Sequence, residues 1–389
     1  MPRCGSLRCC PVAVLAASLL AVFAVYLLGS DRGGFSSGSR RVEAGPAGRG
    51  PGAGAGGPGA GGSGGAGAGG PGGAGAGGPG AGPGGLLSAG PRRRREFHAL
   101  MMFTKAERTR GLRDKMAVAL RSMAAVAEFR DDELLHLHLV TDPPSTALAT
   151  PLLQHCLHRA RFSYQVTFHD VDSLTHKLFP IVEAMQKRFS AGSGTYYSDS
   201  IFFLSVAMHR IMPPEMTQIV QLDLDVKYRT NIRNLFEEFD KFQPEAVIGI
   251  ARELQPVYRH ALWQYRRENP GTVVGEPPPG IPGFNSGVVL LDLGRMRSSA
   301  LYNRLLEPGN VEKLAEKYRF KGHLGDQDFF TVAGMEHPGL FHPLNCTWNR
   351  QLCTWWRDHG YADVFDLYFQ CRGEVNIYHG NCNTPIPEE

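Results

Sequence analysis

The chain has 389 residues and a formal net charge of +4, but its composition is divided between two unlike parts. Residues 45–85 contain 24 of the 48 glycines, whereas residues 96–389 carry 31 basic and 35 acidic side chains. A mildly acidic globular part argues against a nucleic-acid-binding protein, whose basic footprint should lie on the folded domain. The glycines follow no strict three-residue period, which excludes collagen.

The first segment is predicted to anchor the chain in a membrane. Residues 12–28 contain no charged side chain, and their 17 positions are at the short end of a bilayer-spanning helix. A cleaved signal peptide has a similar basic start and apolar stretch and is the alternative, but no convincing small-x-small cleavage site follows residue 28. We therefore expect an uncleaved transmembrane signal-anchor behind a short cytoplasmic tail at residues 1–11.

Residues 29–96 are predicted to form a disordered stem. Their Gly, Ala and Pro side chains cannot bury enough apolar surface to offset the conformational entropy of the chain. The basic run at residues 92–95 is typical of a solvated linker. The stem would hold the domain at residues 97–389 away from the membrane.

From residue 97 onward, short apolar strands alternate with amphipathic helices. Strands are predicted at residues 99–103, 136–140, 164–169 and 219–224, and helices at residues 112–128, 176–189 and 197–211. Strands separated by helices of this length indicate an α/β domain with a mostly parallel central sheet and helices on both faces. Ligands of such sheets bind at the carboxyl ends of the strands.

Two aspartates stand at the end of one of these strands. Asp223 and Asp225 are two residues apart, so on a strand both side chains point the same way. Neighbouring carboxylates repel each other unless a cation lies between them, and oxygen ligands suit Mn²⁺ or Mg²⁺. A haloacid-dehalogenase phosphatase also uses a strand-end Asp-x-Asp, but it normally has Thr or Val where this chain has Lys227.

Four ordered blocks resemble glycosyltransferase family 8. They are the Asp-x-Asp segment IVQLDLDVKYRTNIRNLF at 219–236, the FNSG strand at 283–291, the DQD block at 325–328 and the histidine–glycine element at 377–380. Together with LMMFTKAE at the start of the domain, the resemblance covers nearly all of residues 97–389. It implies a GT-A-type nucleotide-sugar-binding fold and transfer of a sugar with retention of its anomeric configuration.

The resemblance also implies roles for individual residues. Asp223, Asp225 and His379 would hold the Mn²⁺ ion, and Asn285, Asp326 and Gln327 would orient the donor sugar. A helix N-cap is the alternative role for Asp326. Gln327 is neutral and a poor nucleophile, which favours front-face transfer over a two-step route. The residues expected to contact the nucleotide-sugar are Thr104, Lys105, Asp199, Leu224, Ser286, Gly380 and Asn381.

Two further segments, at 177–213 and 346–361, closely resemble animal family members that transfer xylose. Such members are implied to be type II proteins of the endoplasmic reticulum membrane. They add xylose from UDP-xylose, in α-1,3 linkage, to xylose-glucose glycans on EGF-like repeats of Notch-type receptors. The family's Lys-Pro-Trp after the terminal histidine is missing here, so a catalytically inactive relative that binds UDP-sugars or glycoproteins is the alternative.

The aromatic and cysteine residues near the C-terminus suggest further roles. Trp355 and Trp356 would form a stacking platform for the acceptor glycan, with ordinary core packing as the alternative. Two disulfides with three possible pairings are expected in an oxidising lumen from Cys346, Cys353, Cys371 and Cys382. A zinc site is the competing interpretation, but the spacings are not Cys-x2-Cys. Cys156 is left over as a buried free thiol.

Overall fold

The computed structural model describes residues 94–190 and 200–388. The predicted tail and anchor, and the stem up to residue 93, lie outside the described residues, as does Asp199. Within these two ranges, no helix combines the length and the apolar character needed to cross a membrane. The first strand begins at Arg95, two residues before the predicted start of the domain.

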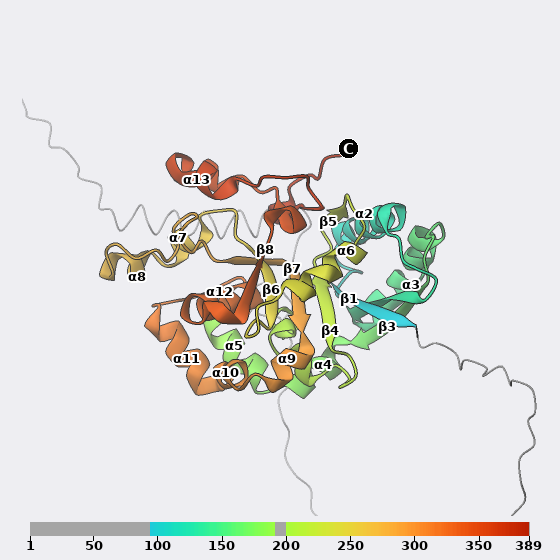
Figure 1. Cartoon of the computed structure of the whole chain (residues 1–389), viewed down its shortest axis with the longest axis horizontal. Coiled ribbons are helices and arrows are strands. Elements are labelled where there is room, and N and C mark those ends of the chain that lie inside the picture. The colour runs from blue at the N-terminus through green and yellow to red at the C-terminus, as the bar shows by residue number, and fades with distance from the viewer. Residues whose placement is uncertain (1–93, 191–199, 389) are drawn as a thin grey trace, which may run out of the picture. The chain divides into compact units, whose positions relative to one another are not determined.

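A seven-stranded sheet lies at the centre of the domain, in the order β3–β2–β1–β4–β7–β6–β8 (Figure 1). Among the described strands of this sheet, β7 alone runs against its neighbours, so the predicted mostly parallel arrangement is confirmed. The strands are β1 (Arg95–Phe103), β2 (Glu133–Thr141), β3 (Tyr164–Asp170), β4 (Gln218–Leu222), β6 (Ile248–Arg252), β7 (Phe284–Asp292) and β8 (Phe341–Leu344).

Helices cover both faces of the sheet and enclose a separate apolar core on each. The side-chain alternation of a strand explains the division, because Ala99 and Met101 lie in one core and Leu100 lies in the other. The core of Ala99 packs under α2 (Arg110–Val126), α3 (Pro143–Leu157) and α6 (Arg233–Phe236). The other packs under α4 (Val171–Leu178), α5 (Ile181–Phe189), α9 (Leu293–Ser298), α10 (Ala300–Leu305), α11 (Pro308–Lys317) and α12 (Asp326–Glu336).

Two of the predicted helices differ from those observed. The helix expected at residues 176–189 is divided into α4 and α5 around Phe179–Pro180, because proline lacks an N–H and disfavours helical backbone at the preceding residue. The described part of the helix expected at 197–211 consists of 3₁₀ turns. Residues 201–209 are buried almost throughout. Their backbone conformation is therefore determined by packing on all sides, and not by one apolar face as in an amphipathic helix.

A second, three-stranded sheet brings the C-terminal segment to the end of β4. It contains β5 (Val226–Tyr228), β10 (Ile377–His379) and β9 (Arg350–Gln351) in that order. The remaining helices are α7 (Val257–Ala261), α8 (Trp263–Glu268) and α13 (Ala362–Phe369). The 3₁₀ turns of the described residues, including the two within 200–210, are η2 (Ser200–Phe203), η3 (Ser205–Arg210), η4 (Glu237–Lys241), η5 (Pro338–Leu340), η6 (Cys346–Asn349), η7 (Trp355–Arg357) and η8 (Asn381–Asn383).

Two disulfides fasten the segment that carries β9 and β10. Cys346 pairs with Cys371 and Cys353 pairs with Cys382, with Cα–Cα distances of 5.7 and 5.6 Å. The structure thus confirms the predicted disulfides and selects one of the three possible pairings. It also confirms that Cys156 is a buried free thiol.

Candidate active site

Three side chains that could ligate one cation meet at the end of β4. Nε2 of His379 lies 3.5 Å from Oδ2 of Asp223 and 3.4 Å from Oδ1 of Asp225. One ligand atom from each residue lies within 4.8 Å of those of the other two. The sequence predicted this trio, but β4 ends at Leu222, so a turn and not strand alternation directs the two carboxylates.

Backbone hydrogen bonds hold this turn in place from both sides. The N–H of Asp223 donates to the carbonyl of Gly287 on β7 at 2.9 Å. The N–H of Gly380, next to His379, donates to the carbonyl of Asp225 at 2.7 Å. The carboxylates and the imidazole are therefore positioned by rigid strands from three parts of the chain.

A buried amide fixes the orientation of His379, which is only 4% exposed. Nδ1 of the imidazole lies 2.9 Å from Oδ1 of Asn349, and the amide nitrogen of Asn349 donates to Oδ1 of Asn285 at 2.9 Å. Because a carbonyl oxygen only accepts, Nδ1 of His379 carries the proton. Nε2 is thereby left facing the two aspartates, where it would supply its lone pair to a bound cation, as metal-ligating histidines commonly do.

Gly287 lies directly against the His379 ring. A Cβ atom added at this glycine would meet Cε1 of His379 at 2.3 Å and Nδ1 at 2.4 Å. The glycine of the FNSG block is therefore required because any side chain would displace the imidazole.

The electrostatics of the trio suit a divalent cation. Burial alone would lower the pKa of His379, but hydrogen bonds and charges from Asp223 and Asp225 outweigh it and raise the pKa to about 10. Burial also opposes the charge on Asp225, yet His379 and Lys115 hold the pKa of its carboxyl well below the usual value. The low pKa of Asp225 shows that this carboxylate favours a positive partner, and two carboxylates with one imidazole form a donor set that fits Mn²⁺ or Mg²⁺.

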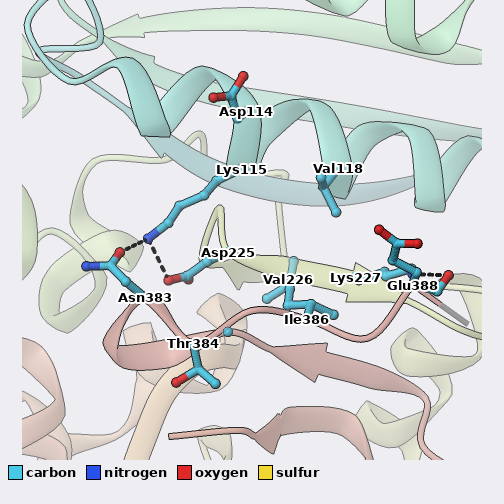
Figure 2. A pocket seen from close by; sticks show the side chains of 11 residues that line it. Asp114, Lys115, Val118, Asp225, Val226, Lys227, Asn383, Thr384, Ile386 and Glu388 are labelled. Carbon is cyan, nitrogen blue, oxygen red and sulfur yellow. Dashed lines mark hydrogen bonds and ion pairs between the residues drawn. The ribbon is translucent and has the colours of Figure 1, made fainter.

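Lys115 is a charged residue of the site that sequence reasoning missed. Its Nζ lies 3.1 Å from Oδ2 of Asp225 and 2.8 Å from Oδ1 of Asn383 (Figure 2). It lines a cavity of about 390 Å³ together with Asp225, Gly380 and Thr384. Lys115 is on α2, 110 residues before Asp225, and no sequence motif marks it.

A buried carboxylate joins two of the predicted catalytic residues. Oε2 of Glu253 accepts hydrogen bonds from Nδ2 of Asn285 at 3.1 Å and Nε2 of Gln327 at 3.2 Å. Glu253 is 2% exposed, and burial raises the pKa of its carboxyl to about 7. Sequence reasoning did not single it out, although an acidic residue immediately after the buried strand β6 was a usable signal.

Asp326 begins α12, with Gly325 at the N-cap position. Its carboxylate accepts hydrogen bonds from Ser205 at 2.5 Å and Ser286 at 3.0 Å, and from the amide of Gln221 at 3.3 Å. These bonds tie α12 to β4 and β7, which is a different role from the N-cap alternative. Burial raises the pKa of Asp326 to about 7.

Two residues expected to contact the nucleotide lie at the carboxyl end of β1. Thr104 follows the last residue of the strand, and the N–H of Lys105 donates to Oδ2 of Asp142 at 2.6 Å. Asp142 itself follows β2, so these residues share one edge of the sheet. Leu224 is buried in the turn between the two aspartates.

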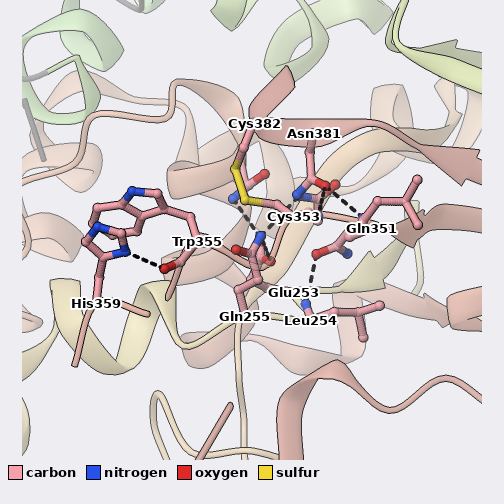
Figure 3. Close-up of a disulfide and its surroundings, with 12 residues drawn as sticks. Glu253, Leu254, Gln255, Gln351, Cys353, Trp355, His359, Asn381 and Cys382 are labelled. Atoms are coloured by element: carbon pink, nitrogen blue, oxygen red, sulfur yellow. Dashed lines mark hydrogen bonds between the residues drawn. A yellow bond between two sulfur atoms is a disulfide. The ribbon is translucent and has the colours of Figure 1, made fainter. Parts of the chain in front are cut away.

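Asn381 holds the loop after β9. Its Oδ1 accepts hydrogen bonds from the backbone N–H groups of Leu352 and Cys353, each at 3.0 Å, beside the Cys353–Cys382 disulfide (Figure 3). The carboxamide oxygen therefore stabilises the loop.

The two tryptophans of η7 are only partly buried, and Trp356 packs against the edge of one apolar core. Their rings are perpendicular with centroids 5.0 Å apart. Trp355 stacks on His359 at 3.7 Å, as Figure 3 shows, and Trp356 packs against His260 and Tyr361. Both tryptophans are half-buried, so their role towards an acceptor stays a prediction.

Three comparisons with known proteins agree. Residues 153–362 match the model of glycosyl transferase family 8. The chain is 59% identical to both human and mouse "Xyloside xylosyltransferase 1", and the alignments cover 100% of this chain and 97% of each relative. The crystal structure of the mouse enzyme in its apo form matches with a TM-score of 0.72 and 67% identity, over 75% of this chain and 100% of that chain.

Proposed function

Because this chain belongs to glycosyltransferase family 8 and is a xylosyltransferase, we propose that it transfers xylose from UDP-xylose to a xyloside acceptor. The observation that carries the proposal is the trio of Asp223, Asp225 and His379 beside the buried amides of Asn285 and Gln327. The full-length similarity to xylosyltransferases favours an enzyme over a relative that only binds sugar nucleotides.

The proposed acceptor is the xylose of xylose-glucose O-glycans on EGF-like repeats of Notch-type proteins, joined in α-1,3 linkage. The word "xyloside" in the names of the 59%-identical relatives supports a xylose-containing acceptor. The repeats and the linkage rest on the segments at 177–213 and 346–361 that resemble xylose-transferring members. Trp355 is the proposed stacking surface for this glycan.

The proposed metal ion is Mn²⁺, held by Asp223, Asp225 and Nε2 of His379. A bound divalent cation would offset the negative charge of the donor's diphosphate and so favour departure of UDP. Asn349 keeps the imidazole in the tautomer that ligation requires, and Gly287 leaves room for its ring.

Lys115 is proposed to bind the diphosphate of the donor. Family members would use the lysine of Lys-Pro-Trp for this purpose, but residues 381–385 of this chain contain no lysine. The ammonium group of Lys115 reaches the same site from α2 and already contacts Asp225. A charge-assisted hydrogen bond from this group to a phosphate oxygen would replace the missing contact.

The buried carboxylates favour front-face transfer. Glu253 is covered, and its Oε2 is occupied by the amides of Asn285 and Gln327. Both oxygens of Asp326 accept hydrogen bonds as well. Neither carboxylate is free to attack the anomeric carbon. We propose that the bond from this carbon to UDP breaks as its bond to the acceptor oxygen forms on the same face, and that a phosphate oxygen of UDP takes the acceptor's proton.

The proposed location is the endoplasmic reticulum membrane, with a single-pass anchor at residues 12–28 and the catalytic domain in the lumen. The two disulfides support an oxidising compartment. Protease digestion of intact microsomes should spare the domain from about residue 97 onward. Digestion of the domain without detergent would contradict this orientation.

The function can be tested with the purified full-length protein in detergent. UDP release should require Mn²⁺ and a xylosyl-glucosyl EGF-like repeat, and should be fastest with UDP-xylose among a panel of UDP-sugars. The product's anomeric configuration, read by NMR coupling constants, should match that of the donor. Equal turnover with UDP-glucose would contradict the donor, and an inverted product would contradict the front-face step.

A further inference from the structure

A second group of side chains that could hold a metal ion, which includes His98, His136 and His138, lies on the other half of the central sheet. Residues two apart on a strand share a face, which places Glu96 and His98 of β1 beside His136 and His138 of β2. The register pairs His98 with His136. His169 of β3 completes what we call the histidine cluster, which comprises Glu96, His98, His136, His138 and His169.

The histidine cluster lies on the face of the central sheet where β1 and β2 otherwise carry apolar side chains. Further along the same strands, Leu100 and Val140 belong to the apolar core. Glu96, His98 and His136 lie in the amino-terminal halves of β1 and β2, whereas the trio of Asp223, Asp225 and His379 follows the carboxyl end of β4. Nothing in the proposed transfer reaction uses these histidines.

Two imidazoles of the cluster converge on one carboxylate. Oε2 of Glu96 lies 3.3 Å from Nδ1 of His136 and 3.9 Å from Nε2 of His98. The second nitrogen of each imidazole, which does not face Glu96, lies within hydrogen-bond distance of another side chain. Nδ1 of His98 lies 3.1 Å from Nε2 of His138, and Nε2 of His136 lies 2.8 Å from Oγ1 of Thr167.

These bonds behind the rings have the arrangement that supports metal ligands. A ligating histidine almost always donates its second N–H to a neighbour, which fixes its ring and tautomer. When His98 donates to His138, Nε2 of His98 keeps its lone pair toward Glu96. His138 can in turn donate through Nδ1 to Nε2 of His169, 2.9 Å away, so the chain of imidazoles accommodates this tautomer.

The cluster runs from a buried histidine to an exposed carboxylate. His138 is 3% exposed, and His98 and His136 are partly buried. The carboxylate of Glu96 is 43% exposed, so an ion between these groups would keep one side open to water.

We propose that Glu96, His98 and His136 form a second metal site that binds a divalent ion of the zinc class. Two imidazoles and one carboxylate with an open fourth position form a common zinc donor set, and imidazole favours Zn²⁺, Cu²⁺ or Ni²⁺ over Mn²⁺. The ion would join the first residues of β1 to β2 and stabilise the domain where it begins. His138 acts as a positioning residue for His98.

The test uses the untagged full-length protein with the Asp223→Asn and Asp225→Asn changes, which remove the first site. Equilibrium dialysis should show one Zn²⁺ bound per chain, and saturating Zn²⁺ should raise the Tm. Adding Glu96→Gln and His136→Gln should abolish both effects. His138→Gln should weaken Zn²⁺ binding by about 10- to 100-fold, the usual effect of losing a partner behind a ligand.

The matched control carries Glu107→Gln and His158→Gln, which change an exposed carboxylate and an exposed imidazole away from the cluster. It should bind Zn²⁺ as tightly as the protein it was made from. The proposal is overturned if that protein binds no Zn²⁺, or if the Glu96→Gln and His136→Gln changes leave binding intact. If His136→Gln prevents folding, the Glu96→Gln change is tested alone, because the Glu96 side chain is partly exposed. Unchanged Zn²⁺ binding in the same dialysis measurement would then overturn the proposal.

Discussion

Replacing Gly287 by alanine tests the metal trio with a single methyl group. The added Cβ would lie 2.3 Å from Cε1 of His379, whereas ordinary van der Waals contacts begin at 3.4 Å. The imidazole must therefore retreat by about 1 Å, and a misplacement of this size can cost about 100-fold in rate. We also expect Mn²⁺ to bind about 10- to 100-fold more weakly, equivalent to about 1.4–2.8 kcal/mol.

The assay measures UDP release from UDP-xylose over a series of Mn²⁺ concentrations, with Mn²⁺ affinity measured separately by electron paramagnetic resonance. Gly309→Ala is the matched control, because a Cβ there meets no atom within 4 Å, and it should leave both quantities unchanged. Combining Gly287→Ala with His379→Ala should recover the stability lost through overpacking, about 1–3 kcal/mol, but not the activity. A folded Gly287→Ala protein with normal Mn²⁺ affinity and rate would refute the placement of His379.

Three further changes probe the surroundings of the trio. Asn349→Ala removes the acceptor of the His379 N–H and should weaken Mn²⁺ binding about 10- to 100-fold, measured by the same resonance method. Lys115→Met should raise the Kd for UDP about tenfold by calorimetry at saturating Mn²⁺, and unchanged affinity would exclude phosphate contact. Glu253 has a folded-state pKa of about 7 against an ordinary 4.5, so the free energy of unfolding should fall as pH rises through this interval. Glu253→Gln should reduce that fall by up to about 3 kcal/mol at pH 8, in denaturant titrations at pH 4.5 and 8, and leave the part that Asp326 contributes through its own raised pKa.

Local sequence patterns predicted four of the seven strands of the central sheet, the family resemblance supplied β7, and β6 and β8 were not predicted. The strands predicted at 136–140 and 164–169 lie within a few residues of the bounds of β2 and β3. A short run of alternating or continuous apolar residues favours a strand in a buried sheet. Residues 176–189 are helical as predicted except at Phe179–Pro180, where the proline divides the expected single helix into α4 and α5. The 3₁₀ turns within 200–210 could not be predicted, since their burial on all sides comes from distant elements.

By itself, the sequence determined the α/β class, the order of the motif blocks and the residue types that could ligate a cation. These depend on the local spacing of side chains and on short motifs, which remain visible in the linear chain. The family resemblance added the expectation that Asp223, Asp225 and His379 meet, but only the tertiary structure decided which further residues reach this trio. Lys115 reaches Asp225 across 110 positions, and Asn349 orients His379 across 30. The disulfide pairing and the convergence of Glu96, His98 and His136 were likewise decided by strand register and chain crossing, because contacts between distant positions exist only after the strands have paired.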